Sequence, residues 1–457
     1  MPEFTKTLTL PHISPEELFA WHAREGAFQR LTTPWQKIRI VEHKGSITNG
    51  SILKFRIYQG PLPVTWEAHH DNHIENKQFQ DIQKRGPFRS WRHTHRFDPS
   101  PEGGVTLTDH IEYTLPVHPL SAPLAPILFE PMLERMFNFR HARTRHDMTR
   151  HQKFKDAPRQ TIAISGASGL VGEALTHFLT TGGHEVRKLT RSASDDPKSI
   201  HWDIKSQSID AQKLEGVDVV IHLAGEPINQ RWTDEAKERV LQSRKQGTAL
   251  LAQTIAKLDS KPRVFISASA VGFYGNGGSD IKTYESSAGS NFLAQVCTAW
   301  EESTRPANEA GIRVVNSRFG VILSAKGGAL EQMLTPFKMG VGGRIGDGKQ
   351  YMSWIAMDDV LGALYEAIFN EEIQGPMNVT APEPVTNEEF TKVLGDVLNR
   401  PTLLPVPNFG LYALVGKKAA KELLLEGQRA VPKKLQQHGF EFEYADLEHA
   451  LRHTLGR

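Results

Sequence analysis

The sequence has little that would point to an exported or membrane-bound protein. Its single cysteine, Cys297, excludes an intrachain disulfide, which fits a reducing compartment. No window approaches the roughly 20 apolar residues that a membrane-spanning helix needs, and the N-terminus lacks the apolar run of a signal peptide. We therefore expect a cytoplasmic protein without a membrane partner.

The sequence also lacks an excess of charge of either sign. Its 54 lysines and arginines face 52 aspartates and glutamates, a formal net charge of +2 at pH 7. This balance gives no electrostatic reason to expect a nucleic acid or an acidic membrane surface as a partner. An apolar fraction of 39% and a charged fraction of 23% are instead typical of a globular protein with a sizeable core.

At 457 residues the chain is too long for one ordinary domain, and its residue pattern changes once. Residues 151–160, HQKFKDAPRQ, are polar and basic, contain a proline and show no apolar period, as a linker would. We expect one domain over 1–150, a linker over 151–160, a second domain over 161–400 and a C-terminal cap segment over 401–457.

The first part is rich in predicted strands. Val105, Leu107, Ile111, Tyr113 and Leu115 recur at period two, which indicates a strand with one buried face. Further strands are predicted at 51–58, 64–70, 79–84 and 90–97, with helices at 15–27 and about 124–145. The last helix has an apolar face that consists of Leu128, Met132, Leu133, Met136, Phe137 and the stem of Arg140. The simplest fold that accommodates these elements is an α+β helix-grip domain, in which a curved antiparallel sheet surrounds one long helix.

The second part alternates short apolar strands with longer helices. Strands are predicted at 161–165, 185–189, 217–223, 264–267 and 313–318, with helices between them. This alternation indicates an α/β fold of the Rossmann type, a doubly wound parallel sheet covered on both faces. From about residue 326 the chain mixes glycine-rich loops and helices, which we expect to form a lobe that caps a ligand.

A glycine-rich turn joins the first strand of the second part to its first helix. The turn consists of Gly166, Ala167, Ser168, Gly169, Leu170, Val171 and Gly172. A pyrophosphate needs a backbone without side chains in its way and amides that point at it, and a helix N-terminus supplies those amides and a favourable dipole. The strand–turn–helix context therefore predicts a dinucleotide site.

The end of the second strand indicates which dinucleotide is bound. An NAD site places a carboxylate there for the ribose hydroxyls. This chain has Lys188-Leu-Thr-Arg191-Ser192 instead. Because the Arg191 guanidinium can pair with a 2′-phosphate through two parallel bonds, we predict NADP as the cofactor.

At this point the sequence resembles the extended short-chain dehydrogenase/reductases, in particular the "epimerase family" branch that carries a distinct C-terminal segment. The resemblance covers roughly 161–457 and rests on chained motifs: the glycine turn, HLAG at 222–225, SASAVGFYG at 267–275, RFGVIL at 318–323, GGAL at 327–330 and GDGKQYMSWI at 346–355. Residues 1–150 resemble a START-like, polyketide-cyclase-like ligand-binding domain. Some relatives carry labels that refer to cell division.

The resemblance implies roles for individual residues. Gly166, Gly169 and Gly172 would hold the pyrophosphate with the residues between them, and Arg191 would hold the 2′-phosphate. Asp203 would bond the adenine amino group. Three residues, Leu223, Ala224 and Gly225, would line the ribose–nicotinamide path. Ser269 would lie beside the substrate carbonyl or hydroxyl, and Ser165 replaces the usual threonine before the first glycine.

The standard catalytic pair of that family is absent. Its Tyr-x-x-x-Lys motif uses the lysine to lower the tyrosine pKa for proton transfer. None of the eight tyrosines has a lysine four residues later, and the pair's expected place holds Phe292 and Val296. Three alternatives follow: Ser269 and Tyr274 substitute as catalytic residues, the domain binds NADP without turnover, or the substrate, such as an activated alkene, needs no proton shuttle.

Other residues invite weaker hypotheses. Cys297 follows apolar neighbours on a helix, which favours a buried thiol over a nucleophile. His93 and His95 share a strand face, but no cysteine or carboxylate motif completes a site, so we expect a polar strand face or a cavity lining and no metal. Trp66, Trp91, Phe97 and Tyr113 line either an ordinary core or an apolar ligand cavity.

The sequence thus predicts an NADP-dependent oxidoreductase or a sugar-nucleotide-epimerase-like enzyme that acts on an unidentified small metabolite. The alternative is a non-catalytic NADP-binding sensor or regulator, coupled to the first domain's hydrophobic ligand and linked to cell division. A homo-oligomer is compatible with either. The glycine-rich segment 340–349 is either a lid, with Arg344 or Lys349 on an anionic substrate, or a plain surface loop.

Overall fold

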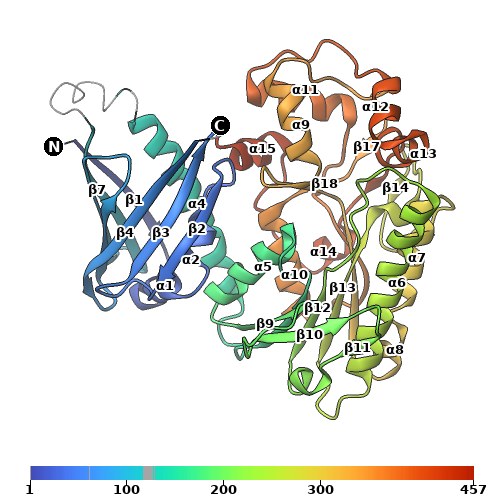
Figure 1. Ribbon diagram of the computed structural model, residues 1–457, viewed down its shortest axis with the longest axis horizontal. Helices are drawn as coiled ribbons and strands as arrows, with labels where there is room; N and C mark the ends of the chain where they lie inside the picture. The colour runs from blue at the N-terminus through green and yellow to red at the C-terminus, as the bar shows by residue number, and fades with distance from the viewer. Residues whose placement is uncertain (1, 61, 117–126, 128) are drawn as a thin grey trace. The chain divides into compact units, whose positions relative to one another are not determined.

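The computed structural model describes residues 2–60, 62–116, 127 and 129–457 (Figure 1). Its contacts divide the chain into two compact units. The first unit comprises Met1–Asp156, His177–Gly183 and Gly456, and the second comprises the rest. Among the helices within the described ranges, none is long and apolar enough to cross a membrane.

A seven-stranded antiparallel sheet forms most of the first unit. Its strands are β1 (Glu3–Leu10), β2 (Ile38–Lys44), β3 (Ile52–Gln59), β4 (Leu62–Ile74), β5 (Gln78–Arg85), β6 (Ser90–Pro99) and β7 (Val105–Thr114). They pair in the order β1-β7-β6-β5-β4-β3-β2. The alternating burial of β7 confirms the predicted period-two face, whereas the two edge strands, β1 and β2, were not predicted.

Three helices complete the first unit: α1 (Pro15–Ala23), α2 (Ala27–Leu31) and α4 (Glu130–Lys153). Residues 124–126 and 128, where the last helix was predicted to begin, lie outside the described residues. Helix α4 runs past the predicted end at 145 and into the predicted linker, because its last turns are buried. There Asp147 accepts a 2.7 Å hydrogen bond from Arg30 Nε. Met132, predicted on the buried face, is instead about half exposed.

Two apolar clusters fill the space between this sheet and its helices. One surrounds Trp91, Tyr113 and Phe137, and the other surrounds Trp21, Phe79 and Phe97. The four predicted aromatic residues therefore divide between the clusters, since Phe97 belongs to the second while Trp66 packs against the first.

An eight-stranded, mainly parallel sheet organises the second unit. Its strands are β8 (Thr161–Ser165), β9 (Glu185–Thr190), β10 (Ser199–Asp203), β11 (Ser208–Ile209), β12 (Val219–His222), β13 (Val264–Ala270), β15 (Arg313–Phe319) and β19 (Gly375–Val379). The order is β11-β10-β9-β8-β12-β13-β15-β19, with only the β10–β11 pair antiparallel. The chain reverses direction across the sheet between β8 and β12. In doubly wound folds ligands bind at the carboxyl ends of the strands beside such a switch point.

Helices cover this sheet, as the sequence predicts (Figure 1). They are α5 (Leu170–Thr181), α6 (Asp234–Ala256), α7 (Phe292–Glu302), α8 (Arg305–Glu309) and α10 (Met357–Phe369). On one face Ala163, Val220 and Phe265 pack against Leu251 and Ile255 of α6. Residues at period two along the strands thus form a core with residues on one side of a helix.

The chain after residue 320 builds a lobe with a core of its own. Its helices are α9 (Gly328–Lys338), α11 (Asn387–Leu398), α12 (Asn408–Val415), α13 (Lys417–Ala420) and α15 (Leu447–Leu455), and its short strands are β16 (Val321–Leu323), β17 (Tyr351–Met352), β18 (Trp354–Ala356) and β20 (Val385–Thr386). Helix α14 (Lys433–Gln437) instead packs against β19 of the eight-stranded sheet. Another short pair joins β14 (Ile281–Lys282) to β21 (Arg429–Ala430). Leu334, Trp354, Phe390 and Leu451 are among the residues of the lobe core.

Candidate functional site

The glycine turn lies between β8 and α5, at the switch point of the sheet. Gly166 has a φ of +73°, and a Cβ there would lie 2.8 Å from the backbone nitrogen of Ala224. A Cβ at Gly172 would lie 2.1 Å from the carbonyl oxygen of Gly166. Glycine is therefore required at both positions. Gly166 has a left-handed backbone that packs closely against residue 224, and Gly172 lies where the helix begins tightly against the turn.

A buried histidine fixes the neighbouring loop. Ser165 and His222 are register partners at the ends of β8 and β12, and Ser165 Oγ lies 2.6 Å from His222 Nδ1 in a shared hydrogen bond. The Ser165 hydroxyl also accepts a 3.4 Å bond from the backbone N–H of Ala224. Burial lowers the pKa of His222 to about 3, with a further contribution from the charge of Arg244. The neutral imidazole thus helps to hold the 223–225 backbone beside the turn.

Arg191 follows β9 and Asp203 ends the adjacent strand β10, but the two residues differ in how they are bonded. Arg191 comes directly after β9 and is exposed, and its guanidinium has no hydrogen bond or ion pair within the described part of the chain. The carboxylate of Asp203 accepts bonds from the Lys205 backbone at 3.0 Å and from Ser206 Oγ at 2.8 Å. Asp203 therefore stabilises its own turn, and its bond to adenine stays a prediction.

Sequence reasoning missed a cation beside the predicted nicotinamide path. The Arg244 guanidinium donates to the carbonyl oxygens of Glu226 and Val240 and lies 4.8 Å from the centre of the Trp300 ring. A Cβ on Gly225 would lie 3.3 Å from the Arg244 guanidinium carbon. A lone arginine within a long helix gives no motif by which it could have been found.

Ser269 and Tyr274 belong to one buried hydrogen-bond network. Ser269, on β13, donates to Glu301 Oε1 at 2.7 Å. Both Glu301 oxygens accept bonds of 2.8 Å from Arg318, whose Nη1 donates to Tyr274 Oη at 2.9 Å. Tyr274 in turn donates to Asn378 Oδ1 at 2.5 Å. The structure thus brings the two predicted catalytic residues into one network, linked through Glu301 and Arg318.

This network counts against Tyr274 as the proton carrier. Burial raises the pKa of Tyr274 despite the neighbouring Arg318 charge. Its proton is used within the fold, and its oxygen also accepts a bond from Arg318. Glu301 and Asn378 were not identified from the sequence, since neither belongs to a recognisable motif.

The helix that should carry the missing catalytic pair is occupied by packing residues. Phe292 lies 5.0 Å from the Trp232 ring, and Val296 is buried. Burial raises the pKa of Cys297 to about 11, which fits the prediction of an unreactive thiol.

The glycine-rich segment 340–349 is fastened to its surroundings. The backbone oxygen of Arg344 accepts a bond from Val406, and the Ile345 amide donates to Asn387 Oδ1. The Arg344 side chain donates to the Asp347 backbone oxygen and lies 3.4 Å from Glu388. These contacts favour the surface-loop interpretation over a lid.

Family models match three parts of the chain. Residues 162–380 match the "NAD dependent epimerase/dehydratase family", 406–454 match a "Domain of unknown function (DUF1731)", and 12–139 match "Polyketide cyclase / dehydrase and lipid transport". An epimerase family protein of Mycobacterium bovis is 42% identical over 297 residues, which are 65% of this chain and 98% of that protein. The chain belongs to the epimerase family.

Solved structures extend the likeness of this epimerase-family protein to its full length. A nucleoside-diphosphate sugar epimerase of Corynebacterium glutamicum is 34% identical, with a TM-score of 0.82, over 99% of this chain and 90% of that one. The human epimerase family protein SDR39U1, solved with NADPH, is 31% identical with a TM-score of 0.60, over 65% of this chain and 99% of that one. Both predicted resemblances and the predicted fold class are confirmed.

Proposed function

We propose that the second unit binds NADP(H) at the carboxyl ends of β8, β9 and β12 and transfers hydride to or from a small metabolite. The position of Arg191 carries the cofactor assignment. It follows β9, which neighbours the strand that leads into the glycine turn, so an exposed guanidinium stands where the outer ribose would lie. The NADPH bound to the human relative supports the same cofactor.

The residues of the turn fit a dinucleotide. Gly166, Gly169 and Gly172 let the backbone of the turn pack tightly at the start of α5, where the helix N-terminus and its dipole favour the pyrophosphate. Arg191 binds the 2′-phosphate, Asp203 faces the adenine, and 223–225 line the path to the nicotinamide. The cofactor supplies the hydride chemistry, and the chain has to position the substrate and move the proton.

The proton route runs through Ser269 rather than a tyrosine. Because the Ser269 hydroxyl donates to Glu301, it presents only lone pairs to a ligand. When a substrate alcohol is oxidised, its proton passes to Ser269 Oγ while the serine proton passes to the Glu301 carboxylate. The reverse transfers protonate the oxygen when a carbonyl is reduced. Arg318 holds Glu301 in position for this step.

A second candidate is a sensor that binds NADP(H) without turnover. The hydrogen bonds of Tyr274 and Ser269 within the fold favour it, as do Phe292 and Val296 at the place of the standard pair. In that case the first unit responds to an apolar ligand. Two buried polar atoms there, Trp91 Nε1 and Tyr113 Oη, have no hydrogen-bond partner among the described residues and would suit the polar end of such a ligand.

Calorimetric titration with NADPH and NADH, followed by a screen of carbonyl, alcohol and alkene substrates, tests the proposal. Tight NADPH binding with turnover supports the enzyme. Ser269→Ala and Glu301→Gln should then lower kcat while the Kd for NADPH stays unchanged. Tight binding without turnover across all three classes supports the sensor. If neither nucleotide binds, both candidates are wrong.

A further inference from the structure

A belt of titratable side chains crosses the first unit between its two apolar clusters. Asp81 on β5 is the register partner of His93 on β6, and His95 on β6 is the register partner of Asp109 on β7. His141 of α4 reaches the same place from the helix side, since its Nε2 lies 2.6 Å from Asp109 Oδ2. Along β6 and β7 these polar residues stand between the apolar residues of the two clusters.

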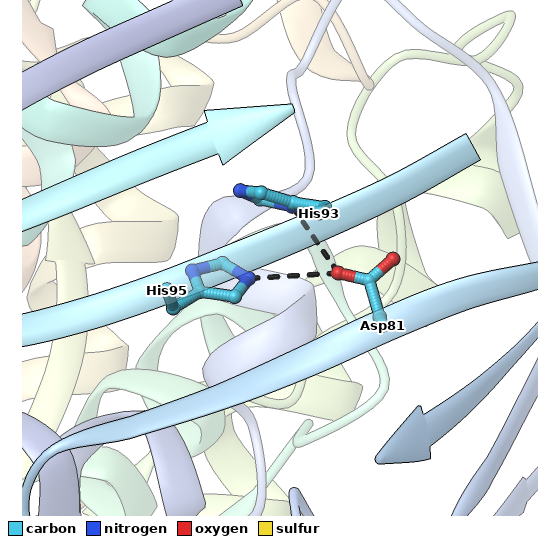
Figure 2. Close-up of side chains that lie close together, drawn as sticks. All are labelled: Asp81, His93 and His95. Carbon is cyan, nitrogen blue, oxygen red and sulfur yellow. Dashed lines mark ion pairs between the residues drawn. The ribbon is translucent and has the colours of Figure 1, made fainter. Parts of the chain in front are cut away.

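Three of these side chains converge as ligands of one metal ion do (Figure 2). Asp81 Oδ2 lies 3.2 Å from His93 Nδ1 and 3.6 Å from His95 Nε2. One ligand atom from each residue lies within 4.8 Å of the other two. Ligands bound tetrahedrally at 2.0–2.1 Å stand about 3.3–3.4 Å apart. The two Asp81 distances therefore already have nearly the spacing of a tetrahedral site.

One of the two remaining ring nitrogens is held in the way that those of metal-binding histidines usually are. His93 Nε2 shares a 2.9 Å hydrogen bond with Asp109 Oδ1, whereas His95 Nδ1 lies 2.8 Å from the same oxygen without hydrogen-bond geometry. Metal-ligating imidazoles commonly direct their second nitrogen to a carboxylate, which fixes ring orientation and raises basicity. His141 in turn holds the other oxygen of Asp109.

The surroundings of the three residues suit a partly dry cation site. The side chains of His93, His95 and Asp81 are 4%, 10% and 19% exposed. Phe79 stacks on the His95 ring at 4.2 Å, and Phe137 meets the His93 ring edge to face at 5.4 Å. A site of two imidazoles and one carboxylate selects a transition-metal ion such as Zn²⁺ rather than Mg²⁺ or Ca²⁺, which prefer oxygen ligands.

We propose that Asp81, His93 and His95 bind a divalent transition-metal ion of the Zn²⁺ class in the first unit. Three protein ligands leave a fourth position for water or a ligand, as in catalytic zinc sites. From the sequence we expect no metal at His93 and His95, because the carboxylate that completes the site comes from another strand, twelve positions before His93. The site is separate from the nucleotide site proposed for the second unit.

Metal titration of the chelator-treated full chain tests the proposal. We expect one saturable Zn²⁺ equivalent by calorimetry, and visible d–d absorption when Co²⁺ replaces Zn²⁺. His93→Gln and Asp81→Asn should abolish both signals. Asp109→Asn, which removes only the supporting carboxylate, should weaken binding by about 10–100-fold.

The outward face of the same sheet provides a matched control. Glu3, His110 and Glu112 also lie within ligand distance of one another there, but Glu3 is exposed and the other two are only partly buried. His110→Gln should leave Zn²⁺ binding and the Co²⁺ spectrum unchanged. A wild-type chain that shows no d–d absorption overturns the proposal without any variant, because the belt is then a metal-free ion-pair network. Loss of binding in His110→Gln alone overturns it equally.

Discussion

Glu301 in the second unit and the pair Asp81 and Asp109 in the first unit all lie among polar side chains, but these carboxylates have different partners. In the second unit Glu301 receives two bonds from the Arg318 guanidinium, whose charge compensates it directly. In the first unit the ion-pair contacts of Asp81 and Asp109, among the described residues, are all with imidazoles. A guanidinium keeps its charge and cannot bind a metal, whereas an imidazole can lose its proton and bind one. Glu301 thus belongs to a closed network, whereas Asp81 belongs to a candidate binding site.

The strongest test of the closed network removes its cation. Arg318→Met should destabilise the second unit by about 3–5 kcal/mol, because it leaves the mostly buried Glu301 carboxylate without its cationic partner. Hydrogen exchange of peptides from β15 measures opening of this unit alone. The double variant with Glu301→Gln should recover much of the loss, and a double variant as unstable as the single one would contradict the pairing.

The pH dependence of the second unit should come partly from His222. Its folded pKa of about 3 lies below the ordinary 6.5, so its stabilising effect is complete above pH 6.5 and declines as the pH falls toward 3. The free energy of unfolding then falls by up to about 1.4 kcal/mol per pH unit. The accumulated loss at pH 4.5 is about 2.5 kcal/mol. Exchange of β12 amides, corrected for intrinsic rates, should show this slope in the wild type and a flatter one in His222→Asn. Equal slopes would exclude His222 as the cause.

The exposed Arg191 of the second unit should contribute to ligand binding rather than to the stability of the fold. Arg191→Ala should weaken NADPH binding by about 1.5–3 kcal/mol and spare NADH, because only NADPH carries the 2′-phosphate. Calorimetry with both nucleotides measures the difference. Lys257→Ala removes the same charge from an exposed position after α6 and should change neither affinity. An equal loss for both nucleotides would refute the 2′-phosphate role.

The smallest expected effect concerns Tyr274. Tyr274→Phe should lower the free energy of unfolding by about 1–2 kcal/mol, because Asn378 Oδ1 and Arg318 Nη1 each lose a hydrogen-bond partner. Turnover, once a substrate is found, should be unchanged. A large fall in kcat with unchanged stability would restore Tyr274 as a catalytic residue.

The sequence predicted features that depend on neighbouring residues along the chain. The glycine turn and the inward face of β7 both follow from spacing alone. Asp109 stands on that face at the same period of two, between Leu107 and Ile111, so its burial was open to prediction. Its partners were not, because its contacts with His93 and His95 depend on the register between β6 and β7.

The same limit applies to the second unit. The Ser165–His222 bond joins residues 57 positions apart, and the Ser269–Glu301 bond joins residues 32 apart. Both depend on how the strands and α7 pack, which no local pattern encodes. The absence of the Tyr-x-x-x-Lys pair is visible in the sequence. The hydrogen-bond network of Ser269, Glu301 and Arg318 is not.

The core of the C-terminal lobe has a consequence for synthesis of the chain. Leu323, Leu330 and Trp354 share this core with Leu451 and Leu455 of α15. The Asp359 carboxylate of α10 accepts backbone bonds from Glu443 and Tyr444, 84 and 85 positions later. While the chain is still on the ribosome, these apolar side chains remain uncovered until α15 has emerged. Chaperones that bind nascent apolar segments therefore have their longest opportunity at this lobe, and a ribosome that stalls before α15 releases a chain prone to aggregate.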